Sequence, residues 1–467
     1  MTVRRVCVVK FVSTLSWTSC KSSRLIRRWL LIALTGLTLL GSASGATAAD
    51  LLVIPITRGN DRATPIAVVP FRWQGAPLTD KIDEIVSFDL ARSGQFVPLP
   101  KGDMLSLPTA ANEIIFRDWK VQGMRYLVIG RLVEETPGRF AATYELYQVG
   151  ESRRIATETL HARKDQMRDL AHVISDAIYE KITHIRGAFS TKIIYVLAQN
   201  FGTPKARFRL DVSDSDGARS RSLFQSKQPI MSPTWSPDAR KVAYVTFESG
   251  RSVVVLQDIA TGARETLANF HGINSGPSFA PDGRNIAMVL SRDGNPEIYM
   301  MDLGSRRLRQ LTHSSEIDTE PSFMADGRNL VFTSNRGGKP QIYSLDVATG
   351  LPERISFDGV YNARPRALND GRNIAYVHRA VANGPFHIAV LDMVTGRNRT
   401  ISETSLDESP SVAPNGMMLI FATVERGRGI LSVVSVDGRV KFRLPSSDGD
   451  VREPAWSPYL DVRSGLQ

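Results

Sequence analysis

The amino-acid sequence predicts a mainly β protein, with a six-bladed β-propeller closed by a split blade and an α/β domain in front of it. Three observations support this fold class: a regular repeat, four strand-like segments in each repeat, and complementary fragments at the two ends of the repeat region. The repeat is a phrase that begins with proline and returns every 44 or 45 residues, at Pro233, Pro277, Pro321, Pro365, Pro410 and Pro454. A period of that length is typical of stacked supersecondary units.

Each repeat unit carries the signals of four antiparallel strands. The phrase is the first strand, and it ends in a dipeptide of the kind found in tight hairpins, where the central residues are expected to need positive φ. These dipeptides are Asp282-Gly283, Asp326-Gly327, Asp370-Gly371 and Asn415-Gly416. An apolar run such as Leu330–Thr333 follows, then a third strand such as Gln341–Leu345, and a fourth after the turn Asp346–Gly350. Four strands in a period of about 40–50 residues is the pattern of a propeller blade.

The two ends of the repeat region complete one another. Residues 192–224, the strands after residue 190, read as strands two to four of a unit with no proline phrase before them. Pro454–Pro458 supplies a first strand with nothing after it. Joining the two removes exposed sheet edges, which are sites of self-pairing. This split blade and five whole blades make six, whereas an open solenoid or two sandwiches would not explain the matching fragments.

The first 49 residues have the composition of a secretory signal. Residues 1–49 hold seven Lys and Arg and no acid, so the formal charge of +11 falls to +4 (11 − 7) on the remaining chain. A basic stretch at Arg24–Arg28 precedes the short apolar run Trp29–Leu40 and the small residues Ala46–Ala49. This order is typical of a cleaved signal peptide. We expect cleavage after Ala48 or Ala49, and the long segment before Arg24 leaves the true start codon open.

Removal of the signal peptide would exclude thiol and disulfide chemistry, and the low net charge of the remaining chain argues against nucleic-acid binding. Both cysteines, Cys7 and Cys20, precede the expected cleavage site, so the exported chain has no thiol and no disulfide. Basic clusters such as Arg306–Arg309 fall on a predicted outer strand, where they are expected to be a solvated face. We therefore expect no nucleic-acid partner.

Residues 50–187 lack the repeat and predict a small α/β domain, followed by the propeller at 188–467. The expected strands are Leu51–Ile56, Pro65–Phe71, Tyr126–Val133, Phe140–Gln148 and Ile155–Ala162. Apolar residues at helical spacing predict helices over Thr79–Ser93 and Asp165–Arg186, ended by Gly94 and Gly187. His172 and His184 are expected on the polar face of the second helix. Periodicity does not give the strand order.

Catalytic and cofactor motifs are missing from the sequence. It contains no Gly-x-Ser-x-Gly elbow, no His-Glu-x-x-His pair and no glycine-rich nucleotide fingerprint. We therefore expect no enzyme activity and no cofactor. Glu316, Asp318, Glu320, Asp407 and Glu408 precede two of the phrases. Such carboxylates could hold a cation at a channel mouth, but a charged rim for a protein partner needs no metal.

The phrases and their surroundings resemble the TolB family of the Gram-negative Tol–Pal system. The matching segments of the propeller are Ser232–Asp238, Val242–Ser252, Leu406–Gly416 and Pro454–Leu460. Those of the first domain are Pro65–Trp73, Asp89–Gly94 and Lys181–Phe189. The resemblance covers nearly all of residues 50–460. The sequence departs from the family pattern at Gly272–Gly276, where an Arg-His pair is expected.

Membership would imply a monomeric periplasmic adaptor, required for outer-membrane integrity and for invagination during division, that meets membranes only through its partners. The propeller mouth would receive the peptidoglycan-associated lipoprotein Pal, and segments of some bacteriocins would imitate it. The residues before each phrase proline would line this mouth: Ile273, Asn274, Ser275, Gly276, Asp318, Thr319, Glu320, Asn362, Ala363, Arg364, Asp407, Glu408, Ser409, Arg452 and Glu453.

A second binding surface would be the mature N-terminal arm, which the resemblance assigns to the protein TolA. It consists of Asp50, Leu51, Leu52, Val53, Ile54, Pro55, Ile56 and Thr57. An apolar, β-prone segment can add a strand to the sheet edge of a partner. The same residues could instead be the first strand of their own domain. A propeller that binds a glycan or another small ligand also remains open, because a fold alone does not determine a function.

Overall fold

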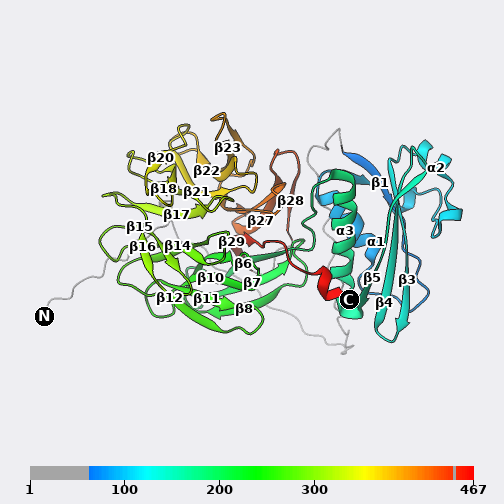
Figure 1. Ribbon diagram of the computed structural model, residues 1–467, viewed down its shortest axis with the longest axis horizontal. Helices are drawn as coiled ribbons and strands as arrows, with labels where there is room; N and C mark the ends of the chain where they lie inside the picture. The colour runs from blue at the N-terminus through cyan, green and yellow to red at the C-terminus, as the bar shows by residue number, and fades with distance from the viewer. Residues whose placement is uncertain (1–62, 445–448, 467) are drawn as a thin grey trace, which may run out of the picture. The chain divides into compact units, whose positions relative to one another are not determined.

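The computed structural model describes residues 63–444 and 449–466 of the chain (Figure 1). The expected signal peptide and the expected arm, Asp50–Thr57, lie outside the described residues. Among the described helices, none combines the length and the apolar character needed to cross a membrane.

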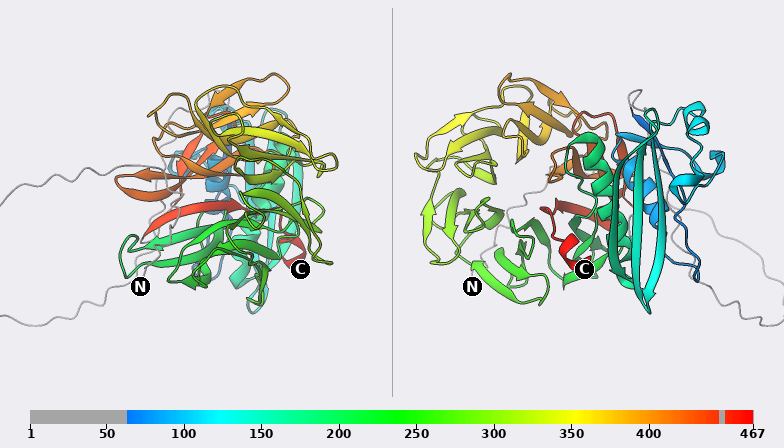
Figure 2. Two further views of the ribbon diagram at one scale, coloured as in Figure 1. Left: turned by 90° about the vertical axis from the view of Figure 1, so that its left-hand side faces the viewer. Right: turned by 45° about the vertical axis from the view of Figure 1, so that its right-hand side comes forward.

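Six four-stranded antiparallel sheets form the propeller (Figure 2, right). In chain order the five whole blades consist of β9 (Ile230–Trp235), β10 (Lys241–Thr246), β11 (Val253–Asp258) and β12 (Arg264–Ala268); β13 (Asn274–Phe279), β14 (Asn285–Leu290), β15 (Glu297–Asp302) and β16 (Leu308–Gln310); β17 (Asp318–Phe323), β18 (Asn329–Ser334), β19 (Gln341–Asp346) and β20 (Pro352–Arg354); β21 (Tyr361–Ala367), β22 (Asn373–Arg379), β23 (His387–Asp392) and β24 (Asn398–Thr400); and β25 (Glu408–Val412), β26 (Met418–Glu425), β27 (Arg428–Ser435) and β28 (Lys441–Arg443).

The sixth blade is split, as the sequence predicts. β29 (Asp450–Trp456) pairs antiparallel with β6 (Lys192–Gln199), which continues to β7 (Arg207–Asp214) and β8 (Arg221–Ser226). One hydrophobic cluster joins this blade to β9–β12 and another joins it to β25–β28. The innermost strands β9, β13, β17, β21, β25 and β29 contact one another in turn, and β29 contacts β9. The predicted six-bladed ring with a split closing blade is confirmed.

The turn that ends each phrase differs in detail from the expectation. Gly283, Gly327, Gly371 and Gly416 have φ between +65° and +72°, but the residue before each of them does not have positive φ. The Asp282 side chain instead accepts hydrogen bonds from the backbone N–H groups of Arg284 and Asn285, at 2.8 and 3.1 Å. Asp326 and Asp370 repeat this arrangement. The repeated dipeptide is therefore part of an Asx turn with one left-handed glycine.

Residues 63–187, called the N-terminal region below, form a mixed sheet in the order β2-β1-β3-β4-β5. Its strands are β1 (Thr64–Val68), β2 (Phe96–Pro98), β3 (Tyr126–Thr136), β4 (Arg139–Gln148) and β5 (Arg153–Arg163). β1 pairs parallel with both β2 and β3, and the other pairs are antiparallel. Two helices, α1 (Ile82–Arg92) and α3 (Met167–Thr183), pack on one another and bury their apolar faces with this sheet.

Several boundaries of the N-terminal region differ from the prediction. α3 ends at Thr183, because His184 adopts a left-handed conformation with φ +61°, so Gly187 does not end the helix. Sequence reasoning also missed β2, the short helix α2 (Phe116–Val121) and the 3₁₀ turns Lys101–Asp103, Ala111–Glu113 and Lys164–Gln166. The boundary between residues 187 and 188 stays a prediction.

The C-terminal tail leaves the split blade and packs on the N-terminal region. After β29 the chain reaches the 3₁₀ turn Arg463–Leu466, and Leu466 is buried in the core that α1, α3 and the mixed sheet share. The Gly465 carbonyl accepts a hydrogen bond from Gln166 at 2.9 Å. The tail therefore ties the ring closure to the N-terminal region.

Candidate functional site

Each innermost strand of the propeller has one residue in the left-handed conformation, immediately before the phrase proline. These residues are Ser232, Gly276, Glu320, Arg364, Ser409 and Glu453, with φ between +50° and +55°. The pairing of each strand with its neighbour shifts at this point. A left-handed conformation costs an L-residue of the order of 1 kcal/mol. Five of the six positions nevertheless carry a side chain, and strain of this kind is found at functional sites.

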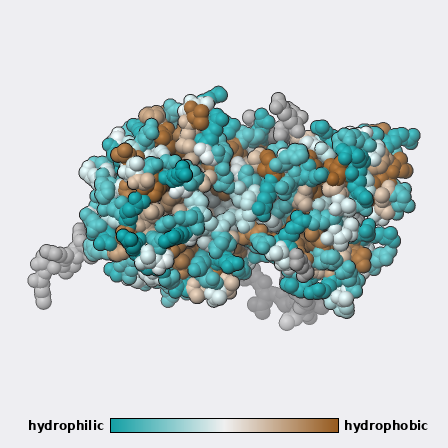
Figure 3. Space-filling model, in the orientation of Figure 1, coloured by the Kyte–Doolittle hydropathy of each residue, from teal (hydrophilic) through white to brown (hydrophobic). Residues whose placement is uncertain are grey.

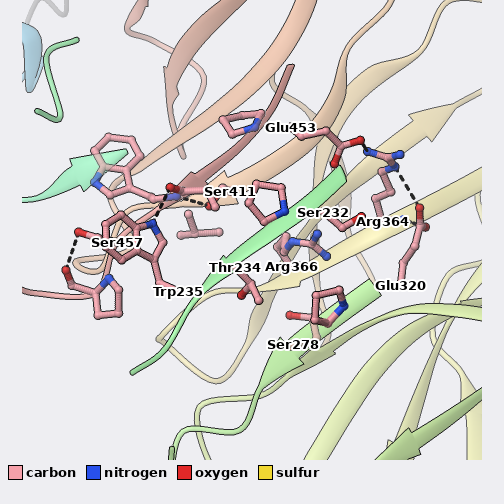
Figure 4. A pocket seen from close by; sticks show the side chains of 18 of the residues that line it. Ser232, Thr234, Trp235, Ser278, Glu320, Arg364, Arg366, Ser411, Glu453 and Ser457 are labelled. Atoms are coloured by element: carbon pink, nitrogen blue, oxygen red, sulfur yellow. Dashed lines mark hydrogen bonds and ion pairs between the residues drawn. The ribbon is translucent and has the colours of Figure 1, made fainter. Parts of the chain in front are cut away.

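Five of these six residues line a cavity of about 380 Å³ in the propeller channel, enclosed by the innermost strands. Figure 4 shows Ser232, Glu320, Arg364 and Glu453 around this space, together with Arg366, Thr234 and Ser278. The sixth residue, Ser409, contacts the Arg364 guanidinium. The strained positions of different blades therefore meet at one place.

Arg364 forms ion pairs with two acidic residues at the strained positions of other blades. Its guanidinium lies 3.0 Å from Glu320 Oε1 and 3.1 Å from Glu453 Oε1 (Figure 4). Burial lowers the pKa of Arg364, but the charges of Glu453, Glu320 and Glu408 outweigh this and raise it above its usual range. The Arg364 guanidinium thus bridges the carboxylates of Glu320 and Glu453. We call Glu320, Arg364, Ser409 and Glu453 the channel cluster.

Two further ionisable residues adjoin the channel cluster. Arg366 lies two residues beyond Arg364 and lines the same cavity. Burial lowers the pKa of Arg366 below its usual range, and the charge of Arg364 adds to this effect. Burial raises the pKa of Glu408, although the charge of Arg364 opposes this shift. A charged group of a partner that entered the cavity would thus meet partly desolvated side chains. Electrostatic interactions are stronger at such sites than in bulk water.

In four of the predicted mouth segments one residue is buried and bonded to its own entry loop, its own blade or the preceding blade. Asn274 donates from Nδ2 to the carbonyls of Phe270 and Ser252, and Asp318 pairs with Arg336. Asn362 donates to Gln341 Oε1 at 2.7 Å, and Asp407 accepts from Ser402 and Thr404. The exposed fraction of each of these side chains is at most 1%. In this structure they hold the entry loops in place, and a contact with a partner stays a prediction for them.

The other predicted mouth residues differ in their burial. Ala363 is buried, Ile273, Ser275 and Thr319 are half-buried, and Gly276 lines the cavity. Arg452 stacks its guanidinium 5.1 Å from the centre of the Phe201 ring. The structure thus brings Gly276, Glu320, Arg364, Ser409 and Glu453 together, and places the remaining predicted residues around them.

Exposed apolar side chains occur on the loops at the same end of the propeller. In an antiparallel blade, the loop into the first strand and the loop between the second and third strands lie at one end. Phe357 is on the former kind of loop, and Phe201 and Val381 are on the latter, with exposed fractions of 72%, 55% and 63%. On the face drawn in Figure 3, hydrophobic residues lie in small separate groups among polar ones. Aromatic side chains such as those of Phe201 and Phe357 are enriched at protein-binding surfaces.

Sequence reasoning missed Ser232, Arg366 and the exposed residues Phe201, Phe357 and Val381. Ser232 could have been found, because it precedes Gly276 by one repeat of 44 residues. Arg366 could also have been found, since it is the only charged residue at its position in the phrases. The exposed apolar residues are on loops of variable length and have no periodic signal.

One group of possible metal ligands occurs among residues 63–444 and 449–466, outside the channel. Asp89, His172 and Asp216 have ligand atoms within 4.8 Å of one another, and all three are buried. Arg92 pairs with Asp89 at 3.0 Å, and Arg168 pairs with Asp216. A metal ion here would face two guanidinium groups, so the arrangement is an ion-pair network and not a metal site.

Comparison with known proteins gives consistent matches over most of the chain. A model described as "TolB beta propeller domain" matches residues 179–460, and one described as "TolB amino-terminal domain" matches residues 52–155. The Tol-Pal system protein TolB of Pseudomonas fluorescens is 57% identical over 421 residues, which cover 90% of this chain and 96% of the relative. That of Pseudomonas aeruginosa is 56% identical over 431 residues, covering 92% and 99%. The crystal structure of TolB from Acinetobacter baumannii superimposes with a TM-score of 0.80 at 42% identity, covering 87% of this chain and 99% of the other.

Proposed function

This chain belongs to the TolB family of Tol-Pal system proteins, and on that premise we propose that it is a periplasmic adaptor with two protein-binding surfaces. One surface is the propeller mouth, which receives the lipoprotein Pal. The other is the mature N-terminal arm, which binds TolA. The membership agrees with the prediction that the chain is not an enzyme.

The observation that carries the assignment of the mouth is the channel cluster. Glu320, Arg364, Ser409 and Glu453 come from four blades, and each is held in a strained conformation before a proline. Such preorganised charges fix the register of a partner and lower the entropy lost on binding. The exposed Phe201, Phe357 and Val381 around the opening supply apolar contact area. A protein loop or helix end with both charged and apolar groups fits this surface.

The proposal for the arm depends on sequence. Residues 50–57 are apolar and lie outside the described residues, and they precede β1, which already pairs on both sides with β2 and β3. The arm therefore needs another sheet edge if it is to form a strand, and a partner can offer one. We further propose that occupation of the mouth changes the exposure of the arm and so tunes TolA binding, which requires that Pal bind the two arm states with different affinity.

Binding measurements with the mature chain test this function. The expected result is that residues 50–467 bind both the soluble domain of Pal and the C-terminal domain of TolA. Deletion of the arm should remove TolA binding only. The alternative, a glycan or small ligand, is favoured by the size of the channel cavity, about 380 Å³. Binding of peptidoglycan fragments without binding of Pal would support that alternative and contradict the adaptor.

A further inference from the structure

A buried histidine lies where the N-terminal region meets the propeller. His172 is on α3, where the sequence predicts a polar, exposed face, but only 2% of its surface is exposed. That prediction is wrong because the turn Asp214–Asp216, which begins at the last residue of β7, covers this face of the helix. The Nδ1 atom of His172 lies 2.7 Å from Asp89 Oδ2 on α1.

The second ring nitrogen of His172 faces the propeller. His172 Nε2 is buried and has no hydrogen-bond partner. It lies 3.8 Å from Asp216 Oδ2 and 4.0 Å from Asp214 Oδ2. If the ring is neutral and donates from Nδ1 to Asp89, the lone pair of Nε2 points at two carboxylates. If the ring is protonated, Nε2–H points at the same carboxylates with a favourable charge, so the geometry favours the imidazolium form.

The charges around His172 are balanced only when it carries a proton. The ion pairs at this contact involve five carboxylates and four Lys or Arg side chains. From α1 and the segment before it come Asp80, Asp89 and Arg92; from α3 come Arg168 and Asp169; from the propeller come Lys192, Asp214, Asp216 and Arg219. A further carboxylate on α3, Asp176, is bonded to Phe189 and Ser190 instead. The imidazolium supplies the fifth positive charge of the network.

We propose that His172 is a proton-dependent latch: its imidazolium holds α3 of the N-terminal region against the Asp214–Asp216 turn of the propeller, and loss of the proton weakens this contact. The latch joins the part of the chain that carries the arm to the part that carries the mouth. A change of pH would therefore alter how firmly the two are held together.

The direction of the effect follows from the pKa. Burial lowers the pKa of His172, but the charge of Asp89, their hydrogen bond and the charge of Asp216 outweigh this and raise it above 6.5. A raised pKa means that the stabilisation is complete below the pKa of the unfolded state, about 6.5, and is lost as pH rises through the folded-state value. Asp89, Asp214 and Asp216 have lowered pKa values, so they lose their stabilisation only at acidic pH below about 4.

Nuclear magnetic resonance can read the protonation state directly. The mature chain with ¹⁵N-labelled histidine contains seven histidines, and His172→Gln assigns the His172 signals. We expect the ¹⁵N shifts of both His172 nitrogens to change together from those of imidazolium to those of neutral imidazole, with a midpoint above the ordinary value of about 6.5. A midpoint at or below that value would overturn the proposal, whether or not other variants fold.

A distance measurement tests the latch itself. Residues 50–467 contain no cysteine, so introduced cysteines are the only labelling sites. Spin labels can be attached at Val121→Cys in α2 and Val394→Cys in the propeller, because these positions are 79% and 75% exposed. Above pH 6.5 we expect molecules with the two labels far apart to become more abundant relative to those with the labels close together. The ratio of these populations should rise by up to about tenfold per pH unit until the pH exceeds the pKa of His172 in the folded chain. His172→Gln should remove this dependence, and His161→Gln, an exposed histidine of β5, should retain it. A pH-independent ratio in the unsubstituted chain, or the same dependence in His172→Gln, would contradict the latch.

Discussion

The indole Nε1 of Trp456 donates a hydrogen bond to Thr191 Oγ1 at 2.8 Å, between residues that are 265 positions apart in the sequence. Trp456 ends the last strand of the ring, and Thr191 immediately precedes β6, with which that strand pairs. Both residues are buried, and Thr191 Oγ1 also donates to the Ala188 carbonyl at 2.6 Å. Packing and hydrogen bonding of Trp456 therefore contribute to the closure of the propeller, together with the pairing of β29 and β6.

Loss of the Trp456 side chain should destabilise the propeller. Replacement of a buried tryptophan by alanine removes a large apolar surface and leaves a cavity, which costs about 3–5 kcal/mol. We expect Trp456→Ala to lower the free energy of unfolding by that amount, measured by urea denaturation of the mature chain. Deletion of residues 453–467 should cost more, since it also leaves two unpaired sheet edges. A truncated chain that melts like the full-length one would refute the split blade.

Neutralisation of the channel cluster should weaken binding of Pal, on the proposed function. Arg364→Gln removes the charge that lies between Glu320 and Glu453, so these carboxylates lose their shared partner. Loss of one member of a desolvated charge network typically costs 2 kcal/mol or more. We expect affinity for the soluble domain of Pal to fall at least about tenfold, measured by calorimetry.

Arg372→Gln is the matched control for Arg364→Gln. Arg372 pairs with Asp392 at 2.5 Å and is half-exposed, at the end of the same blade that is remote from the channel opening. Its substitution should leave the affinity for Pal unchanged. Equal losses in the two variants would show that the cluster has no particular role in binding.

Asp176 should make the stability depend on pH in the acidic range. Burial raises the pKa of Asp176 to about 6 from the ordinary 3.8, although Ser190 and Phe189 donate hydrogen bonds to it. A raised pKa stabilises the fold below pH 4, and this contribution is lost as pH rises through 6. The shift of about two units corresponds to about 3 kcal/mol.

A comparison of the unfolding free energies of the unsubstituted chain and of Asp176→Asn isolates this effect. The variant should be less stable throughout, because an amide nitrogen cannot accept the hydrogen bonds of Ser190. The difference in unfolding free energy between the two chains should shrink between pH 4 and pH 7. A difference that stays constant over that range would mean that Asp176 does not titrate there.

Deletion of Asp50–Thr57 should separate the two proposed binding surfaces. These residues are far along the chain from the channel cluster, so their loss should leave the affinity for Pal within about twofold of the unsubstituted chain. Binding of the TolA C-terminal domain should be lost, as measured by interferometry. TolA affinity that survives the deletion would remove the arm from the proposed function.

The propeller could be predicted from the sequence because its signals are local and repeated. A proline phrase every 44 or 45 residues marks each innermost strand, and the fragments at 192–224 and 454–458 already indicate the closure. The same period predicts where Gly276, Glu320, Arg364, Ser409 and Glu453 lie. It does not predict that Asn274 or Asp318 is buried, since that depends on bonds to neighbouring loops.

The N-terminal region shows where such reasoning ends. β2 has three residues and α2 has six, too few for a periodic pattern, and the parallel pairing of β1 with β2 and β3 joins segments that are distant in sequence. The error about His172 has a similar origin. The spacing of apolar residues in a helix shows which face packs on the sheet of its own domain. It does not show that a turn from another domain, here Asp214–Asp216, covers a polar face.

Site-specific photocross-linking tests the proposed docking surface most directly. Leu351 and Phe357 lie before and after β20 and are exposed to 73% and 72%, but Phe357 lies at the channel opening and Leu351 at the opposite end. A photoreactive residue placed at each position in turn is expected to capture Pal in cells from position 357 and not from position 351. Capture from position 351, or equal capture from both, would contradict the assignment of the mouth as the surface that binds Pal.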